Sequence, residues 1–599
     1  MITEYKKVVK LLTKREKRRL FFLTVVKIFS GIMDMVGVAS IAPFIAVVSK
    51  PEILDRNEII LNLKEILSLN NEDIIFYFAL GSIFIIIINQ FARVLSLWYE
   101  RYVIKNIWRS FYGQLFKFYL TRPYEFHIRT NSKNLLEKLQ VEVSRVADGS
   151  LGTIFQLIGN TATCLFLFFF LFFIYPAVTS AVLFSTTALY WLFFSRVKNK
   201  INKYAEFQPL FAERTFVLID KAFQSVKDIL IKNNQNFYEK ILEPLTKNFA
   251  KTNINYNTIL IFPKAITEVL AYVFLLGITF YFLKTSGDFS NVVVIISLYA
   301  FAFSRILPAV QGLYQTISAY KFNLPSLGRI YEDLLLAKKL NEENIKNKDE
   351  IKNFNFKNKI KFSNVKFKYP ESEKMTLELH DFEIKAGSFV GVTGKTGSGK
   401  TTLIDLMLGL LSPNSGEITI DGNILNSNFN KSWQKKIGYV PQNPFMADES
   451  IKNNIAFGSD VEDYDFKKIK EVAKIAQLDD FIENDLPKKY DTIVGENGIK
   501  LSGGERQRLS IARALYRDPD IIFFDEATNS LDVLTEKSII ESVIKYKKKR
   551  TLIMITHRLP TLKNCDEILM IDKGTLANRG SYDFLRKNNQ MFLELEKKI

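Results

Sequence analysis

The chain has 599 residues, and 48% of them are hydrophobic, including 51 Phe. That length exceeds one domain, and 81 Lys and Arg against 63 Asp and Glu give a net charge of +18, which fits either nucleic acid or an anionic membrane surface. The long apolar runs of the same chain favour the membrane. The two cysteines, Cys164 and Cys565, lie far apart and outside any CxxC spacing, so they indicate neither a disulfide framework nor a zinc site.

Apolar segments long enough to cross a membrane occupy the first 320 residues. A hydrocarbon core of about 30 Å takes about 20 helical residues. Six segments reach this length: Leu20–Val48, Ile74–Tyr99, Leu151–Ile174, Ala177–Ser195, Phe262–Leu283 and Val292–Ile317. The first is too long for the apolar part of a cleavable signal peptide, so we expect it to be retained. Residues 20–320 are therefore predicted to form an α-helical membrane domain behind a basic segment at 1–19.

Lys and Arg in the flanks of these spans predict their orientation. The segment 1–19, the stretches 100–148 and 196–257, and the sequence after Lys321 are all rich in Lys and Arg. With six spans, all of these fall on one side of the membrane, which the positive-inside rule makes the cytoplasm. The two long stretches carry apolar residues at helical spacing, which predicts helices that continue beyond the bilayer; a solvated loop is the alternative.

The connection between the first two spans, residues 51–69, predicts a short amphipathic helix outside the membrane. Its apolar side chains recur at helical spacing on one side: Ile59, Ile60, Leu63, Ile66 and Leu67. A helix of this kind suits the membrane interface. Packing against the spans is the alternative.

The second half of the chain has the composition of a soluble domain. Residues 321–358 are predicted to be a linker, because from about Ala337 the sequence is dense in Lys, Asn and Glu. Over residues 359–599 short β-branched runs alternate with amphipathic stretches, which is the pattern of an α/β domain.

A phosphate-binding loop follows the apolar strand Ser388–Val392. It has the pattern GxxxxGK[ST] with one further threonine, and its residues are Gly394, Lys395, Thr396, Gly397, Ser398, Gly399, Lys400, Thr401 and Thr402. Glycines let the backbone wrap the phosphates, whose charge faces N–H groups and a helix N-terminus. Lys400 is expected to reach the β- and γ-phosphates and Thr401 to offer its hydroxyl to Mg²⁺. The predicted cofactors are therefore ATP and Mg²⁺.

Two further motifs follow the loop along the chain. A second apolar strand, Ile521–Phe524, ends in Asp525 and Glu526. Asp525 suits the Mg²⁺ site, and Glu526 is placed to polarise the attacking water. Between the loop and this strand, Leu501–Glu505 has the sequence LSGGE and opens a basic helix. Each motif is common alone, and their order downstream of a phosphate-binding loop makes them informative.

That order resembles the nucleotide-binding domains of ABC transporters. The elements in chain order are Tyr369, the phosphate-binding loop, Gln442, Leu501–Glu505, Asp525 with Glu526, Ser530–Asp532 and His557. The resemblance implies that Tyr369 stacks on adenine and that Gln442 senses the γ-phosphate beside the Mg²⁺ ion. It also implies that Glu526 and His557 act in hydrolysis and that Asp532 belongs to the D-loop.

Six spans before one such domain resemble ABC half-exporters of the type IV fold, and this resemblance covers essentially the whole chain. It implies a homodimer, because Ser502, Gly503 and Gly504 would clamp ATP held by the partner; a heterodimer is the alternative. Glu505 stands where Gln is commoner. Candidate coupling helices, which would transmit ATP-driven closure to the spans, are Phe126–Asn134 and Asn233–Tyr238.

A soluble ABC ATPase acting on nucleic acid is not expected. The ABC ATPases of DNA repair carry long coiled coils between the phosphate-binding loop and the LSGGE element. Here only about 100 residues separate Lys400 from Ser502, and the six spans precede both.

Ionisable residues within or near spans are costly and suggest function. They are Lys27, Asp34, Arg93, Lys264, Glu268 and Arg305. Arg93, Lys264 and Arg305 facing a cavity would suit an anionic headgroup such as phosphate or pyrophosphate. The alternative is that Arg93 and Lys264 lie near the cytoplasmic ends and only reach lipid phosphates.

The membrane half also resembles the bacterial lipid-linked oligosaccharide flippases of protein N-glycosylation. The residues that carry this resemblance are Asp55–Asn57, Leu63–Glu65, Arg93, Pro263 with Lys264 near Glu268, and Arg305 before Pro308. Two positions depart from that family, because Lys264 and Gly312 stand where arginines are expected. The implied function is ATP-driven flipping of a polyprenyl-pyrophosphate-linked oligosaccharide or related anionic glycolipid across the bacterial inner membrane. A general exporter of lipid, lipid A-like glycolipid, peptide or drug is the alternative.

Overall fold

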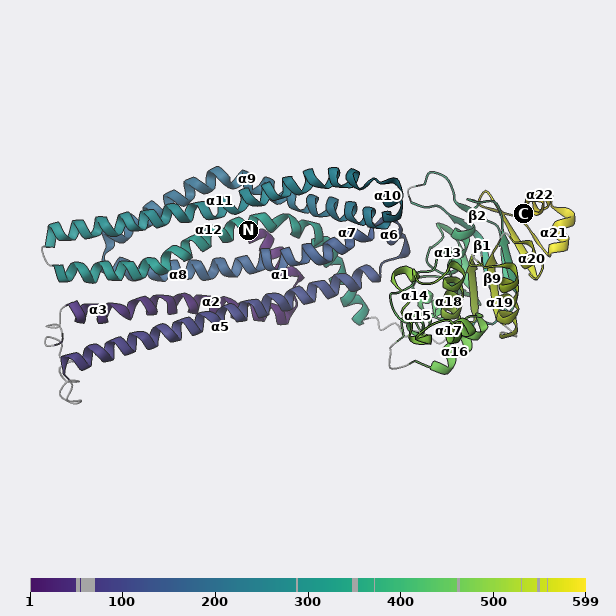
Figure 1. Ribbon diagram of the computed structural model, residues 1–599, viewed down its shortest axis with the longest axis horizontal. Helices are drawn as coiled ribbons and strands as arrows, with labels where there is room; N and C mark the ends of the chain where they lie inside the picture. The colour runs from purple at the N-terminus through teal and green to yellow at the C-terminus, as the bar shows by residue number, and fades with distance from the viewer. Residues whose placement is uncertain are drawn as a thin grey trace. The chain divides into compact units, whose positions relative to one another are not determined.

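The computed structural model describes residues 2–49, 54, 70–286, 289–346, 354–370, 372–459, 464–528, 531–546, 550–556 and 558–598. The chain separates into two compact units (Figure 1). The first, the membrane unit, comprises Met1–Arg122 and His127–Lys346, and the second, the ATPase unit, comprises Pro123–Phe126 and Asn347–Ile599. The predicted external helix 51–69 lies outside the described residues, apart from Leu54.

Over its described residues, the membrane unit consists of helices joined by short connections, with no strand. Its α-helices are α1 (Ile2–Leu11), α2 (Lys14–Ala39), α3 (Ile41–Ser49), α5 (Asn71–Leu120), α7 (Ser132–Glu137), α8 (Thr153–Ile174), α9 (Pro176–Gln224), α10 (Val226–Lys232), α11 (Gln235–Ser286) and α12 (Phe289–Lys346). The short α6 (Tyr124–Arg129) bridges the two units in sequence, and two π-helical stretches, η2 (Lys138–Glu142) and η3 (Arg145–Gly152), join α7 to α8.

Six described helical segments are long and apolar enough to cross a membrane. They are Lys14–Ser49, Asn71–Leu120, Ser132–Ile174, Pro176–Phe207, Gln235–Tyr281 and Val292–Glu342, and they contain most or all of each predicted span. Large apolar side chains such as Phe84 and Phe173 are 65% and 82% exposed within the chain, as lipid-facing residues are. The protein is therefore a multi-pass membrane protein.

Several of these helices continue far beyond a bilayer. The 50 residues of α5 extend about 75 Å at about 1.5 Å per residue. Residues 100–120 and 196–224 are thus helical, as the apolar spacing predicts. The expected linker 321–358 needs correction, because α12 continues to Lys346. Leu327, Ile330 and Leu334 recur at helical spacing and are at most 2% exposed, so this stretch packs in the membrane unit.

The two loop tips also differ from the expected coupling helices. The segment Phe126–Asn134 contains the end of α6, a break, and the start of α7 at Ser132. In Asn233–Tyr238, Asn233 has a φ of 50° and ends α10, and α11 begins two residues later at Gln235. The left-handed Asn233 terminates the helix there, so the helix at this tip is α10.

The spans α2 and α8 approach each other closely because Gly31 lies between them. A Cβ on Gly31 would lie 2.8 Å from the Cβ of Ala162, which is closer than two side chains can pack. Small residues at such contacts let membrane helices come together. The start of α2 is fixed by a capping box, in which Glu16 N donates to Thr13 Oγ1 at 3.3 Å and Thr13 N donates to Glu16 Oε2 at 2.7 Å.

A buried ionic cluster joins α12 to the segment before α8. Arg329 Nη1 donates to Glu137 Oε1 at 2.9 Å and to Glu142 Oε1 at 2.7 Å. The two glutamate side chains are 2% and 0% exposed. Glu213 of α9 lies 3.5 Å from Arg329 Nη2 and is 39% exposed. One guanidinium thus serves two buried carboxylates.

The described residues of the ATPase unit form two β-sheets. The five-stranded sheet has the order β2-β1-β5-β6 with β3 also paired to β1, and its strands are β1 (Lys359–Phe367), β2 (Leu377–Leu379), β3 (Phe382–Lys385), β5 (Ser415–Ile420) and β6 (Asn423–Ile424). The six-stranded sheet has the order β11-β10-β4-β9-β8-β7, and its strands are β4 (Phe389–Thr393), β7 (Ile437–Val440), β8 (Ile521–Asp525), β9 (Thr551–Ile555), β10 (Glu567–Asp572) and β11 (Thr575–Gly580).

Helices surround these sheets. They are α13 (Lys400–Met407), α14 (Ser427–Gln434), α15 (Ile451–Ile455), α16 (Phe466–Ile475), α17 (Asp479–Asn484), α18 (Gly503–Tyr516), α19 (Val533–Tyr546), α20 (Leu559–Leu562), α21 (Tyr582–Asn588) and α22 (Gln590–Lys598). Strands β10, β4, β9, β8 and β7 run parallel, and every residue of β4, β8 and β9 is buried. The carboxyl ends of parallel strands meet at one edge, where ligands bind in open α/β sheets.

Candidate ATP site and membrane cavity

The phosphate-binding loop leaves β4 and enters α13, as its sequence predicts. Gly394 has a φ of 153°, and a Cβ there would lie 2.0 Å from the carbonyl oxygen of Ile571. Gly399 has a φ of 102° and caps α13. Side chains would be excluded at both positions, so these glycines are required by backbone conformation and close approach.

Lys400 is folded over this loop. Its Nζ donates to the carbonyl oxygens of Gly394 at 2.9 Å and Lys395 at 3.0 Å, and the residue is 6% exposed. Burial lowers the pKa of Lys400, and the negative charges of Glu526 and Asp525 oppose that shift. The ammonium therefore lies within the field of both carboxylates that the sequence predicts for the site.

The two carboxylates lie at the carboxyl end of β8, the second neighbour of β4 in the sheet, with Asp525 as its last residue and Glu526 directly after it. Asp525 is 6% exposed, and Tyr439 Oη donates to its Oδ2 at 3.4 Å. Burial raises the pKa of Asp525, and the charge of Glu526 raises it further. Glu526 has a φ of 48°, and its Oε2 accepts from Gln442 Nε2 at 2.9 Å. The structure thus places Lys400, Gln442, Asp525 and Glu526 at one edge of the sheet.

This edge offers oxygen donors suited to Mg²⁺. Asp525, Gln442 and the exposed Thr401 at the start of α13 carry the carboxylate, carboxamide and hydroxyl oxygens that hard cations prefer. Among the described residues, no cluster of three His, Cys, Asp or Glu side chains could hold a metal ion alone. A magnesium ion here would therefore share its coordination with nucleotide phosphates and water.

Tyr369 lies beside the same loop. Its hydroxyl and the Thr402 hydroxyl are 3.3 Å apart, and its ring packs edge-on against Phe367 with centroids 5.0 Å apart. The aromatic face predicted to stack on adenine is thus held at the start of α13. The stacking role remains a prediction.

The LSGGE element forms the N-terminus of α18. Glu505 N donates to Ser502 Oγ at 3.3 Å, and Ser502 N donates to Glu505 Oε2 at 2.8 Å. This capping box explains the glutamate, whose carboxylate also suits the positive end of the helix dipole. Gly503 and Gly504 lie in the first turn, where backbone N–H groups can face an anion.

Two further predicted residues lie after β8 and β9. Asp532 caps α19, with its Oδ1 accepting from Thr535 N at 2.9 Å. Hydrogen bonds from the side chain and backbone of Thr535 lower the pKa of Asp532. His557 lies outside the described residues, so its role remains a prediction.

Sequence reasoning missed two residues of this site, Tyr439 and Asp405. Burial raises the pKa of Tyr439 above its usual value, as do the nearby charges of Asp525 and Asp405. Burial and the charge of Asp525 raise the pKa of Asp405 to about 6. Asp405 could have been found, because it is the one acidic residue in the apolar run Leu403–Leu411. Tyr439 carries no comparable signal.

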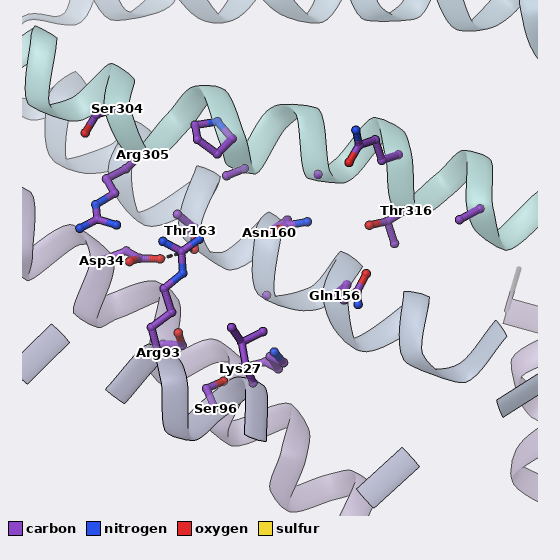
Figure 2. A pocket seen from close by; sticks show the side chains of 18 of the residues that line it. Lys27, Asp34, Arg93, Ser96, Gln156, Asn160, Thr163, Ser304, Arg305 and Thr316 are labelled. Atoms are coloured by element: carbon purple, nitrogen blue, oxygen red, sulfur yellow. Dashed lines mark hydrogen bonds between the residues drawn. The ribbon is translucent and has the colours of Figure 1, made fainter. Parts of the chain in front are cut away.

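The membrane unit contains a cavity of about 620 Å³ between helices of the spans (Figure 2). Lys27 and Asp34 of α2, Arg93 of α5 and Arg305 of α12 all line it. Lys264 does not lie among the lining residues and instead approaches Glu268 on its own helix at 3.7 Å, with both side chains nearly half exposed. Of the three predicted substrate residues, the structure therefore brings Arg93 and Arg305 together and separates Lys264 from them.

The charges around the cavity are compensated to different degrees. Lys27 forms a buried ion pair with Glu100, which also accepts from Gln156 Nε2 at 3.2 Å. Asp34 Oδ2 accepts from Thr163 Oγ1 at 3.0 Å. With the Gln90 amide oxygen turned toward it, Arg305 donates to that oxygen at 2.7 and 3.3 Å. Arg93 has no ion pair or hydrogen bond with another described side chain, and its guanidinium points into the cavity (Figure 2).

Comparison with known proteins adds to this geometry. Residues 377–529 match the family described as ABC transporter. The C-terminal unit is an ABC transporter ATPase domain. With the six apolar helices that precede it, the chain has the architecture of an ABC half-exporter, and it is an ATP-driven translocase.

Two relatives and one solved structure show how far the likeness extends. The half-exporter is 27% identical over 513 residues to the ATP-dependent lipid A-core flippase of Haemophilus influenzae, covering 85% of this chain and 86% of that protein. It is 37% identical over 238 residues to the protein of that name from Escherichia coli K12, covering 40% of each. The structure of a bacterial Atm1-family ABC exporter with ATP bound aligns with this chain at a TM-score of 0.74 and 21% identity. The alignment covers 97% of this chain and 99% of that exporter chain, which confirms the predicted fold class.

Proposed function

We propose that the half-exporter is a homodimeric, ATP-driven flippase for a glycolipid with a phosphorylated headgroup. It would lie in the bacterial inner membrane with its ATPase unit in the cytoplasm, as the basic flanks of the spans predict. The observation that carries the proposal is the cavity with Arg93 and Arg305 on its wall.

The unpaired Arg93 is the strongest part of this argument. A guanidinium within a membrane domain is costly and is normally paired. Arg93 has no counter-ion among the described residues, so the negative charge that complements it would come from the substrate. Guanidinium groups bind phosphate oxygens through two parallel hydrogen bonds, which a single ammonium cannot do.

The relatives support the broad form of the proposal. Those reported above are called lipid A-core flippases, and the match to the Haemophilus protein covers most of both chains. They therefore favour a general lipid or glycolipid exporter over the narrower expectation of a lipid-linked oligosaccharide flippase in protein glycosylation.

In the proposed cycle, two copies of the ATPase unit close on two ATP molecules. Lys400 and the loop N–H groups would hold the β- and γ-phosphates, and Ser502, Gly503 and Gly504 of each copy would contact the γ-phosphate in the other. Mg²⁺ held by Thr401, Asp525 and Gln442 would neutralise phosphate charge. Glu526, positioned by its hydrogen bond from Gln442, would orient and deprotonate water for attack.

Reconstitution into liposomes tests the proposal. We expect lipid A to stimulate ATP hydrolysis and to be moved between leaflets, whereas peptides and hydrophobic drugs do neither. Arg93→Gln should raise the lipid concentration that gives half-maximal stimulation by at least about tenfold. Charge-assisted hydrogen bonds contribute about 1.5–3 kcal/mol, and this variant loses them. Stimulation by peptides or drugs alone would reject a glycolipid substrate.

A polyprenyl-pyrophosphate-linked oligosaccharide is the second candidate. Its support is that Arg93 and Arg305, which carry part of that resemblance, face the cavity. The external segment Ile59–Leu67, which carries another part, lies outside the described residues. Deleting Ile59–Leu67 should impair flipping of a polyprenyl-linked glycan if this candidate is correct, and unchanged flipping would remove the case for that segment.

A further inference from the structure

The cavity has two chemically different ends. Arg305 lies near one end of the α12 wall and Thr316 lies toward the other, about 16 Å away at about 1.5 Å per residue. Across from α12, helix α8 places Thr163 near Arg305, Asn160 in the middle and Gln156 toward Thr316 (Figure 2). The guanidinium groups thus gather toward one end, and uncharged polar groups continue toward the other.

Gly312 and Asn160 make the middle of the cavity polar but uncharged. A Cβ on Gly312 would lie 2.3 Å from Asn160 Nδ2 and 2.9 Å from its Cγ. The Asn160 carboxamide therefore occupies the space that any side chain at position 312 would need. A cation at position 312 is excluded while Asn160 keeps this position, and a neutral group stands there instead.

Further carboxamides continue this neutral surface. Asn160, Asn257 and Gln315 come from α8, α11 and α12, and all three line the cavity. Within the described part of the chain, none of the three makes a side-chain hydrogen bond, whereas Gln156 already donates to Glu100. We call Asn160, Asn257 and Gln315 the amide wall. Each carboxamide offers both donors and an acceptor without charge.

Carboxamides at this place suit a ligand with hydroxyl or acetamido groups. An alkyl chain could not use their hydrogen-bonding capacity. Among the described cavity residues, a second phosphate would find there only Lys27, whose charge is already paired with Glu100. The cavity volume of about 620 Å³ lies within the range of about 300–1,000 Å³ typical of small-ligand sites. That volume fits a phosphate group and the sugar next to it rather than a whole oligosaccharide.

We infer that the amide wall binds the sugar attached to the phosphate, while Arg93 and Arg305 bind the phosphate itself. This inference rests on the proposed function and refines it. The half-exporter would then distinguish glycosylated anionic lipids from anionic lipids that lack a sugar. A solvated polar lining that does not contact substrate is the competing explanation.

Matched probes test the inference. Full-length protein in liposomes is titrated with polyprenyl pyrophosphate, with the same lipid carrying N-acetylglucosamine, and with lipid A, and ATPase stimulation is recorded. The variants are Asn160→Ala, Gln315→Ala and their combination. Thr161→Ala is the control, because Thr161 is the neighbour of Asn160 on α8 but bonds to the backbone of Leu157.

We expect each single variant to raise the half-maximal concentration of the sugar-bearing probes about 2- to 10-fold, as the loss of one neutral hydrogen bond does. For bare polyprenyl pyrophosphate, the half-maximal concentration of these variants should equal that of wild type. Thr161→Ala should match wild type for every probe. Equal loss for sugar-bearing and bare probes, or no loss for either, overturns the inference. A wild type stimulated by none of these lipids instead rejects the proposed function.

A variant that adds a positive charge tests the amide wall through a gain of affinity instead of a loss. Asn160→Gly combined with Gly312→Arg frees the space over position 312 and introduces a cation there. We expect the preference to shift toward bare polyprenyl pyrophosphate by about tenfold or more, because the amide is replaced by a phosphate-binding group. An unchanged preference for the sugar-bearing probe contradicts the inference.

Discussion

Replacing Arg329 by Ala should destabilise the membrane unit, because it removes the cation from a cluster with two buried carboxylates. Arg329 is the guanidinium that hydrogen-bonds both Glu137 and Glu142, whose side chains are 2% and 0% exposed. Removing one partner of a buried ion pair costs about 3–5 kcal/mol, because the remaining charge stays in a medium of low polarity. Glu137 loses its cationic partner here and Glu142 keeps only Arg145 at 3.9 Å, so we expect a cost within that range.

Thermal unfolding in detergent, followed by the loss of monodisperse protein, gives the first readout. Hydrogen exchange over α7, η2 and the facing part of α12 gives a local readout that does not assume two-state unfolding. Lys138→Ala is the matched control, because Lys138 pairs with Asp333 at 2.8 Å with both side chains about a quarter exposed. Losing that pair should cost less than losing Arg329, because water still reaches the Asp333 carboxylate but not those of Glu137 and Glu142.

A rescue separates charge from packing. Arg329→Met combined with Glu137→Gln and Glu142→Gln removes the three most closely paired charges of the network. It leaves the exposed Glu213 and Arg145, which lies 3.9 Å from Glu142, and should recover most of the lost stability. If Arg329→Ala unfolds like wild type, or if the neutral triple variant remains as unstable as Arg329→Ala, the reasoning from buried charge is wrong.

Three predictions concern the ATPase unit. Glu526→Gln should lower ATP turnover at least about 100-fold, the scale of general-base catalysis, while ATP binding measured by filter retention stays close to wild type. Gly394→Ala should abolish ATP binding, because the added Cβ meets the Ile571 carbonyl oxygen at 2.0 Å; binding like that of wild type would show that the loop can shift. The third uses Asp405, whose pKa is raised to about 6 in the folded protein. A raised carboxyl pKa stabilises the fold at low pH, and that stabilisation is lost as the pH rises through about 6. Asp405→Asn should therefore slow hydrogen exchange over α13 relative to wild type at pH 8 but not at pH 4.5. Equal effects at both pH values would contradict the conclusion that burial raises the pKa of Asp405.

The ATP site can be predicted well from the sequence, because its residues lie at or just after the carboxyl ends of strands that the sequence pattern reveals. Lys400, Asp525 and Glu526 each lie directly after or near a fully buried strand, and parallel strands bring their carboxyl ends to one edge. Tyr439 escapes prediction because its role depends on the neighbouring strand pair β7 and β8, not on any local pattern. Register between strands is a property of the fold, so such contacts appear only in three dimensions.

In the membrane unit, sequence patterns fixed which segments are helical but not where helices stop or what they face. The Lys- and Asn-rich composition after Ala337 suggested a linker from residue 321, yet α12 continues to Lys346 because its apolar residues still have a helical period. Charge alone could not separate Lys264 from Arg93, since both lie in apolar helices. Only packing shows that Arg93 faces the cavity and Lys264 pairs with Glu268.

The balance of charge in the cavity links these observations to the proposed substrate. Among the described residues, its lining carries three cations, Lys27, Arg93 and Arg305, and one acid, Asp34, and Glu100 neutralises Lys27. Three positive charges less two negative ones leave one formal positive charge per chain, and a homodimer would contain two. An anionic headgroup of about two charges, such as a pyrophosphate diester or a phosphorylated sugar lipid, would balance that excess. A further arginine at position 312 would bring in more positive charge than such a headgroup balances. The neutral Asn160 beside Gly312 therefore agrees with a site whose arginines suffice for the phosphate and whose remaining wall contacts a sugar.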